Sequence, residues 1–373
     1  MWPIKSDSDK EQVIPDPNQV KLYEIDEQII SLLNKRVEAV TEITNAATAG
    51  AGDAKIELFS PSKELELIER LQKLNTGSFP NDAIKTIFKE IFCATLSLEH
   101  PMTVAYLGPQ ATYTHQAALK YFSSTCKYIS TDSIKEVFEN VESGNASFGV
   151  VPIENSNEGA VNYTFDMFVD YNLKVYAEIL LSINHHLLSK SGDAEIKKIY
   201  SHPQVIAQCR KWLERHMLGV PIFEAGSTAQ AAAIAAEEKG VAAIGSELAA
   251  KIYDLNVIEK GIENVKDNVT RFLVISKEAQ GSTGNDMTLI MFTAKDQPGA
   301  LHEILTPFKK QKINLTRIES RPSKKKAWDY IFFADMEGHI EDKKVKKALE
   351  EVRKHSVYLK ILGSYPHVET IER

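Results

Sequence analysis

Six short polar clusters in the middle of the chain stand where predicted β-strands end. They occupy residues 108–112, 152–156, 201–204 with Gln208 one helical turn later, 226–228, 245–246 and 270–272. Open α/β sheets bind their ligands at the carboxyl ends of strands, where hydroxyl groups, amides and helix N-termini can hold an anion. A helix cap is the more frequent explanation for any one serine or threonine taken alone. Only the series as a whole predicts a binding cleft.

The cation of this series is Arg271, which directly follows Thr270. An arginine can clamp a carboxylate through two parallel hydrogen bonds, and it can equally tie two lobes together, so both interpretations stay open. His115 and His202 suggest an acid or a base, but neither has a visible partner in the sequence. A packed or loop histidine is the more frequent case, and this holds for residues 185 and 186 as well.

An α/β domain over residues 101–278 would position these clusters. Short β-rich runs alternate there with helical stretches, at residues 104–107, 148–153, 174–181, 199–201, 241–244 and 272–276 for the strands and 229–238 for the clearest helix. Such alternation is typical of α/β folds.

Residues 1–100 have a different, all-helical pattern. Apolar residues recur every three or four positions over 20–46, which predicts one long amphipathic helix, and two further helices are expected over 61–74 and 82–99. Three such helices cannot bury a thick core, so pairing with a second copy of the chain would cover their apolar stripes.

A polar linker over residues 279–286 leads to a third domain, 286–373. Its predicted order is strand 287–293, helix 299–311, strands 313–321 and 328–336, helix 341–354 and strand 357–363. This βαββαβ order predicts a ferredoxin-like α+β domain.

Composition narrows the class of protein. The 373 residues carry a net charge of -7, which gives no basic surface for nucleic acid. The three cysteines have neither disulfide-framework nor zinc-site spacing, so no metal is expected. Neither a signal peptide nor a run long enough to span a bilayer is visible, and we expect a cytoplasmic protein.

The six clusters also carry a family resemblance. Read in order, the segments are LGPQATYTHQAALKYF, VVPIENSNEGAV, YSHPQVIAQC, GSTAQAA, AAIGSELAA and NVTRF. Over residues 104–276 they resemble the prephenate dehydratases of phenylalanine biosynthesis. The resemblance implies two α/β lobes like a type II periplasmic binding protein. It also implies conversion of prephenate to phenylpyruvate with loss of water and carbon dioxide, and no cofactor.

The resemblance assigns roles to single residues. Thr270 matches the threonine on which the family's activity depends, and its hydroxyl would hold the leaving oxygen. Because a threonine hydroxyl is a very weak acid, a carboxyl such as Glu154 would supply the proton. The predicted substrate-binding residues are Thr112, Asn155, Ser201, Gln208, Ser227, Thr228, Arg271 and Phe272.

The segment IDEQIISLLNKR resembles the helical chorismate mutases, which clamp a dicarboxylate with cationic side chains. Matching positions are Arg36, Lys63, Glu64, Thr95 and Glu99. Two expected cations are replaced by Gln19 and Ala47, and Lys55 or Lys21 would have to substitute. The domain is therefore expected to be a weakened or lost mutase that serves mainly for dimerisation, with a fully bifunctional enzyme as the alternative.

Two segments of the last domain resemble the regulatory ACT domain. They provide a predicted effector site at Gly299, Ala300, Leu301, Glu319, Ser320 and Arg321. The implied effector is phenylalanine, held between paired subunits of a homodimer or homotetramer, and the implied effect is feedback inhibition. A noncatalytic carboxylate sensor is the rival from another class, although Thr270 and Asn155 argue against it.

Overall fold

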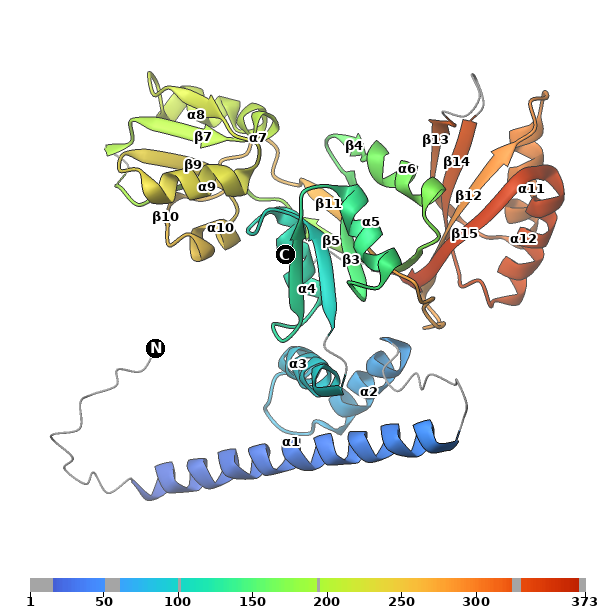
Figure 1. Cartoon of the computed structure of the whole chain (residues 1–373), viewed down its shortest axis with the longest axis horizontal. Helices are drawn as coiled ribbons and strands as arrows, with labels where there is room; N and C mark the ends of the chain where they lie inside the picture. The colour runs from blue at the N-terminus through green and yellow to red at the C-terminus, as the bar shows by residue number, and fades with distance from the viewer. Residues whose placement is uncertain (1–15, 51–60, 100–101, 193–194, 324–329, 369–373) are drawn as a thin grey trace. The chain divides into compact units, whose positions relative to one another are not determined.

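The computed structural model describes residues 16–50, 61–99, 102–192, 195–323 and 330–368. The chain divides into two units, Met1–Phe59 and Ser60–Arg373, and each is described by itself. The described part of the first unit is a single helix. The second unit contains three β-sheets with their helices (Figure 1).

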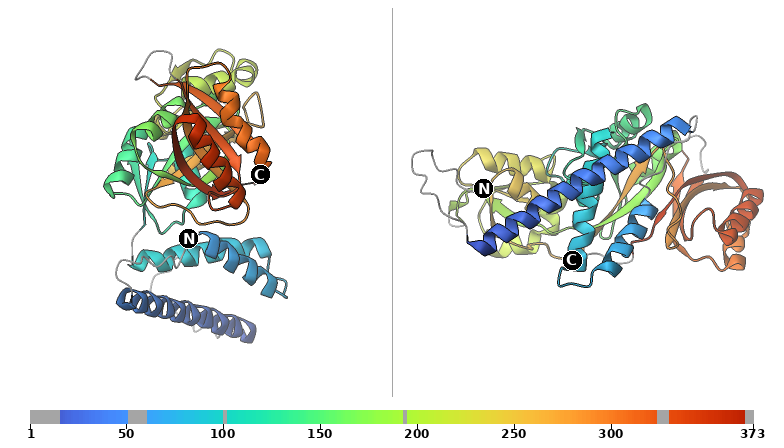
Figure 2. Two further views of the ribbon diagram at one scale, coloured as in Figure 1. Left: turned by 90° about the vertical axis from the view of Figure 1, so that its right-hand side faces the viewer. Right: turned by 90° about the horizontal axis from the view of Figure 1, so that it is seen from below.

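Helix α1 (Pro17–Gly50) confirms the long helix expected from the apolar spacing. Figure 2 shows it as one uninterrupted helix. It runs past residue 46, where we expected it to end, because the alanines there favour a helix. A row of large apolar side chains is exposed along it, namely Val20, Leu22, Tyr23, Ile25, Ile29, Ile30, Leu32 and Ile43.

The second unit begins with α2 (Pro61–Leu74) and α3 (Asn81–Glu99). Helix α3 contacts the α/β part that follows. The Lys89 Nζ donates to the Lys120 carbonyl oxygen at 2.8 Å, and the Ser123 hydroxyl donates to the Glu90 carboxylate at 2.5 Å.

The first α/β lobe is built on a sheet whose main order is β2-β1-β3-β11-β5. Its strands are β1 (Thr103–Leu107), β2 (Lys127–Thr131), β3 (Phe148–Asn155), β4 (Gly159–Ala160), β5 (Lys174–Ser182) and β11 (Val269–Ser276). Helix α4 (Tyr113–Tyr121) shares one core with Phe272 and Val274 of β11. Helices α5 (Ile134–Ser143) and α6 (Asn162–Asp170) share the opposite core with Leu273 and Ile275. Successive residues of β11 therefore point to opposite faces of the sheet.

The second lobe has the order β8-β7-β9-β6-β10. Its strands are β6 (His186–Ser189), β7 (Lys198–Ser201), β8 (Ile222–Glu224), β9 (Val241–Gly245) and β10 (Asn256–Glu259). Its helices are α7 (Pro203–Gln208), α8 (Arg210–His216), α9 (Thr228–Glu237) and α10 (Glu247–Ile252). Strand β9 is parallel to β7, whereas β6, the first strand after the chain enters this lobe, is antiparallel to β9. In the first lobe, β11 is the first strand after the chain returns, and it is likewise antiparallel to its neighbour β3. The expected two-lobed α/β architecture is confirmed.

The C-terminal domain has the sheet order β13-β14-β12-β15 and is antiparallel throughout. Its elements are β12 (Asp286–Ala294), α11 (Ala300–Gln311), β13 (Leu315–Pro322), β14 (Tyr330–Glu337), α12 (Lys343–His355) and β15 (Ser356–Pro366). Both helices lie on the same face of the sheet (Figure 1). The expected ferredoxin-like domain is confirmed.

The other face of this sheet is covered by the first lobe. Ile290 and Phe292 of β12 pack under the two helices, whereas Met287, Leu289 and Met291 pack with Phe165 and other residues of the first lobe's core. Because both faces are covered, the middle of β12 is an unbroken apolar run, Leu289–Phe292. The C-terminal domain and the first lobe thus share a hydrophobic core.

The backbones of β15 and β5 approach each other closely at Gly363. A Cβ atom built on Gly363 would overlap the Val175 backbone, so only glycine fits there. We expect Gly363→Ala to lower the melting temperature of the full chain by roughly 3–10 °C in a thermal unfolding scan. Gly192→Ala is the control, because a Cβ at that position meets no heavy atom of the described residues within 4 Å. An unchanged melting temperature for Gly363→Ala would contradict this packing.

Candidate functional site

Two neighbouring strands, β3 and β11, carry the central residues of the candidate site. Thr270 lies opposite Asn155, and Arg271 lies opposite Glu154, in the antiparallel register. Side chains directly opposite each other share one face of a sheet, and successive side chains alternate. Thr270 with Asn155 and Arg271 with Glu154 therefore form two pairs that face different parts of the molecule.

The Thr270 and Asn155 pair is held in a defined orientation. The Asn155 Oδ1 accepts hydrogen bonds from the backbone N–H groups of Asn157, at 3.0 Å, and Glu158, at 3.2 Å. This leaves the Asn155 Nδ2 to donate to the Thr270 Oγ1 at 2.7 Å. Because the threonine oxygen accepts that bond, its own O–H can still donate to an acceptor. Thr270 is buried, with 8% of its surface exposed.

This pair lies where the chain crosses between the two lobes. The outgoing segment follows β5 and the returning segment precedes β11, and the two meet where the Ile183 N–H donates to the Asn268 carbonyl at 2.8 Å. Ser156 and Val269 are joined in the same way, at 2.8 Å. Relative movement of the lobes would therefore act directly on the ends of β3 and β11.

A chain of polar side chains bridges the lobes next to the pair. Gln208 of α7 donates from Nε2 to the Glu158 carboxylate at 3.1 Å, and its Oε1 lies 2.8 Å from the His185 Nε2. The His185 Nδ1 lies 2.7 Å from the Tyr113 hydroxyl. The Tyr113 hydroxyl also lies 2.8 Å from the Asn184 carbonyl oxygen, so its single proton is shared between that oxygen and the ring nitrogen. Sequence reasoning missed Tyr113 and Glu158, although both stand inside quoted motifs.

Three histidines of the α/β part are buried. Burial lowers the pKa of His115, His185 and His186. His115 stacks on Tyr106 and accepts the Ala111 N–H, which is a packing role. His202 caps α7 by accepting the Gln204 N–H.

The predicted hydroxyl ligands divide into helix caps and packing residues. Thr112 caps α4, and Ser227 caps α9, whose first residue is the buried Thr228. Ser201 is fully buried and donates to the Ile244 carbonyl at 2.8 Å, so it fastens β7 to β9. Phe272 is 2% exposed and lies in the core beneath α4. We assign Ser201 and Phe272 to packing and remove them from the predicted binding set.

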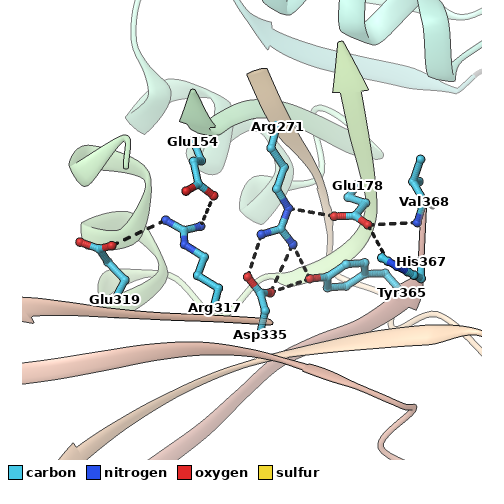
Figure 3. Close-up of polar contacts among 9 residues, drawn as sticks. All are labelled: Glu154, Glu178, Arg271, Arg317, Glu319, Asp335, Tyr365, His367 and Val368. Carbon is cyan, nitrogen blue, oxygen red and sulfur yellow. Dashed lines mark hydrogen bonds and ion pairs between the residues drawn. The ribbon is translucent and has the colours of Figure 1, made fainter. Parts of the chain in front are cut away.

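Arg271 points toward Asp335 and Tyr365 of the C-terminal domain (Figure 3). Its Nε donates to the Glu178 carboxylate at 2.8 Å, and its Nη1 and Nη2 bind the two oxygens of Asp335 at 2.7 and 3.2 Å. The Nη2 also donates to the Tyr365 hydroxyl at 2.7 Å. Burial would lower the pKa of Arg271, but Tyr365, Asp335 and Glu178 together raise it. Because the guanidinium is bound to protein side chains, this arrangement favours a structural role for Arg271 over binding of a substrate carboxylate. The contacts join the first lobe to the C-terminal domain.

Glu154 faces the same way as Arg271. Its carboxylate lies 3.2 Å from the Arg317 Nη1 of β13. A cavity of about 250 Å³ lies between these domains, lined by Glu154, Glu178, Arg271, Met287, Thr316, Arg317, Asp335 and His367. Since Glu154 pairs with a cation of the C-terminal domain, it is not placed to protonate a ligand held by Thr270.

The mutase-like residues fall in both units. Arg36 is half-buried in α1, and burial lowers its pKa. Lys63 is exposed on α2, and the Thr95 hydroxyl donates to the Ile91 carbonyl at 2.7 Å. The side chains of Glu64, Glu99 and Ala47 lie outside the described part, as does Lys55. Gln19 is exposed in the first turn of α1.

The predicted effector residues lie on two elements of the C-terminal domain. Gly299 has a left-handed backbone, with φ 81°, directly before α11, where Ala300 is buried and Leu301 half-buried. Ser320 is exposed on the edge strand β13, whereas Glu319 and Arg321 are half-buried on its other face. The Arg321 Nη2 donates to Asp166 of α6 at 3.3 Å.

Two classes of site are absent from the residues that the structure describes. None of their helices is long and apolar enough to cross a membrane. None of their His, Cys, Asp and Glu side chains gather in threes or more to hold a metal ion.

Three family models match consecutive parts of the chain. The chorismate mutase type II model matches residues 19–100, the prephenate dehydratase model residues 104–280 and the ACT domain model residues 288–354. The bifunctional chorismate mutase/prephenate dehydratase of Aquifex aeolicus is 47% identical over 92% of this chain and 95% of that protein. The protein of the same description from Pseudomonas aeruginosa is 40% identical over 93% of this chain and 96% of its own.

Two solved structures resemble somewhat more than two thirds of the chain. The prephenate dehydratase of Arthrobacter aurescens in complex with L-Phe has a TM-score of 0.66 and 34% identity, over 71% of this chain and 90% of that one. GqqA, described as a novel type of quorum quenching acylase, has a TM-score of 0.66 and 27% identity, over 72% and 98%.

The buried histidines predict a pH dependence of stability. A histidine whose pKa is lowered by folding takes up its proton more readily in the unfolded state, so stability is lost as pH falls through the ordinary histidine value of about 6.5. We expect the melting temperature of the full chain to fall between about pH 7 and pH 5. His185→Gln should flatten part of that decline. An identical slope in the variant would show that His185 titrates normally.

Proposed function

Because this chain belongs to the family of bifunctional chorismate mutase/prephenate dehydratases, we propose that it converts prephenate to phenylpyruvate with loss of water and carbon dioxide. The observation that carries the proposal is the oriented Thr270 and Asn155 pair at the lobe junction. We assign residues 1–100 to the mutase-like domain, 101–278 to the dehydratase domain and 286–373 to the regulatory domain.

The oriented pair suits the chemistry of this elimination. As the ring carboxylate leaves as carbon dioxide, its bonding electrons enter the ring, and the ring hydroxyl departs as water once it gains a proton. The Thr270 oxygen accepts a hydrogen bond from the Asn155 amide, so the Thr270 O–H can donate to the leaving oxygen. Threonine orients and polarises that oxygen, and the proton itself comes from a donor other than Glu154.

The substrate's two carboxylates need anion-binding groups in the cleft. Arg271 is engaged elsewhere, so we infer that helix N-termini take this role. The N-terminus of α4, capped by Thr112, belongs to the first lobe, and that of α9, with Ser227 and Thr228, belongs to the second. Backbone N–H groups and the helix dipole favour an anion at such positions. Gln208 would contribute an amide between them.

Thr270→Val tests the proposal most directly. The variant keeps the side chain's shape but removes the hydroxyl, so we expect kcat for prephenate to fall by about 100-fold or more, as for loss of a single transition-state donor. Thr270→Ser should recover much of that loss. Phe272→Leu is the matched control in the adjoining core, with an expected effect on melting temperature and little on kcat. Consumption of prephenate and appearance of phenylpyruvate are measured.

Two results would contradict the assignment. Near-normal turnover by Thr270→Val would remove Thr270 from the mechanism. A wild-type chain that binds prephenate without consuming it would instead support the noncatalytic sensor.

Feedback control by phenylalanine and assembly from paired subunits complete the proposal. Gly299 and the neighbouring N-terminus of α11 would hold the amino acid's carboxylate, and β13 is an edge strand available to a second subunit. The exposed apolar row on α1 also needs a partner, which a homodimer or homotetramer would provide. We place the enzyme in the cytoplasm, where amino-acid biosynthesis takes place.

Chorismate mutase activity is a second candidate function, favoured by the family match over residues 19–100. Two positions where the resemblance expects a cation hold Gln19 and Ala47. Loss of two charged contacts at about 1–3 kcal/mol each predicts slow chorismate turnover, roughly 30- to 20,000-fold below that of a complete site.

The full chain would be assayed for chorismate and prephenate consumption separately. Arg36→Ala should reduce the chorismate rate further and leave prephenate turnover unchanged. Chorismate turnover as fast as prephenate turnover would show that the two replacements are compensated and that the enzyme is fully bifunctional.

A further inference from the structure

The charged cluster around Arg271 lies between the dehydratase domain and the regulatory domain. Only 14% of the Arg271 side chain is exposed, with 6% of Glu178 and 1% of Asp335. Of the five N–H donors of the guanidinium, four have protein acceptors within 3.2 Å. A side chain with that many fixed partners is a rigid connection.

The charged cluster is only one residue away from the catalytic pair on each of the two strands. Arg271 directly follows Thr270 on β11, and Glu154 directly precedes Asn155 on β3. Each outward-facing member of these pairs contacts the regulatory domain, Arg271 through Asp335 of β14 and Glu154 through Arg317 of β13. A displacement of β13 and β14 would therefore move the backbone that carries Thr270 and Asn155.

The regulatory end of the connection adjoins the predicted effector residues. Arg317, Glu319 and Arg321 alternate along β13 and are all half-buried, and the two arginines pair with Glu154 and Asp166 of the first lobe. Arg317 also lies over the Phe165 ring, 4.9 Å from its centroid. An effector that shifts β13 would thus move the partner of Glu154.

We propose that Arg271 is a positioning residue: its ion pair with Asp335 fixes the Thr270 hydroxyl relative to the regulatory domain and transmits that domain's state to the catalytic pair. This inference rests on the proposed dehydratase function. This role replaces the predicted substrate-binding role of Arg271, because its guanidinium lies on the opposite face of the sheet from Thr270.

Tyr365→Phe and Asp335→Asn test the proposal in the full chain. Tyr365→Phe removes one hydrogen bond from Arg271 and keeps the core filled, so it should fold even where Asp335→Asn does not. Lys360→Met is the matched control. It removes two other hydrogen bonds between these domains, to the Phe168 and Tyr171 carbonyls, and none of its partners lies on β3 or β11.

The measurements are kcat and KM for prephenate and the phenylalanine concentration that gives half-inhibition, at temperatures where each variant is folded. We expect Tyr365→Phe and Asp335→Asn to lower kcat by about fivefold or more with KM within about twofold, since no substrate contact is lost. The half-inhibition concentration should change by about fivefold or more. Lys360→Met should leave all three within about twofold.

A different split would overturn the inference. If Arg271 binds substrate, Arg271→Lys would raise KM about tenfold or more, while Tyr365→Phe and Asp335→Asn would behave as wild type. If the cluster only holds the domains together, the same two variants would melt earlier yet keep kcat, KM and phenylalanine response. Failure of the proposed function itself is recognised separately, since the wild-type chain would then consume no prephenate.

Discussion

The alternation of side chains along the paired strands β3 and β11 is the constraint on which the candidate site depends. It sends Thr270 and Asn155 toward the lobe junction and sends Arg271 and Glu154 toward the regulatory domain. One pair of strands thereby serves chemistry on one face and interdomain contact on the other. The sheet's covered faces make this arrangement rigid, because a one-residue slip would exchange the two sets of side chains.

Much of the architecture could be predicted because it is written in local patterns. The order of elements in the C-terminal domain follows from short-range periodicity, and so does the long helix α1. The partners of Arg271 could not be found in this way, since Glu178 and Asp335 lie 93 and 64 residues away. One signal was nevertheless available: adjacent residues in a strand cannot share a face, so Thr270 and Arg271 could not both line one cleft.

Hydroxyl groups show where residue type alone is insufficient. Ser201 ends a predicted strand and Ser227 precedes a predicted helix, both in matching motifs. Ser201 fastens two buried strands, whereas Ser227 caps a helix. Ser201 is buried because its strand, β7, lies inside the sheet between β9 and β8, and this position depends on strand pairing between segments far apart in the sequence. Phe272 is similar: the family resemblance predicted a substrate contact, whereas its side chain lies in the core beneath α4.

The chemical nature of the Arg271 cluster is itself an argument about its role. Buried ion pairs give little net stability, because desolvation offsets most of their attraction, and apolar replacements of similar volume are often neutral or better by about 1–4 kcal/mol. The two domains already share an apolar core through Phe165 and Phe333, so adhesion alone would not require buried charges. Hydrogen bonds are directional, so they fix one relative position of the two domains. They weaken steeply when the domains shift by a small distance. Such a connection is suited to coupling a displacement of the regulatory domain to the position of Thr270.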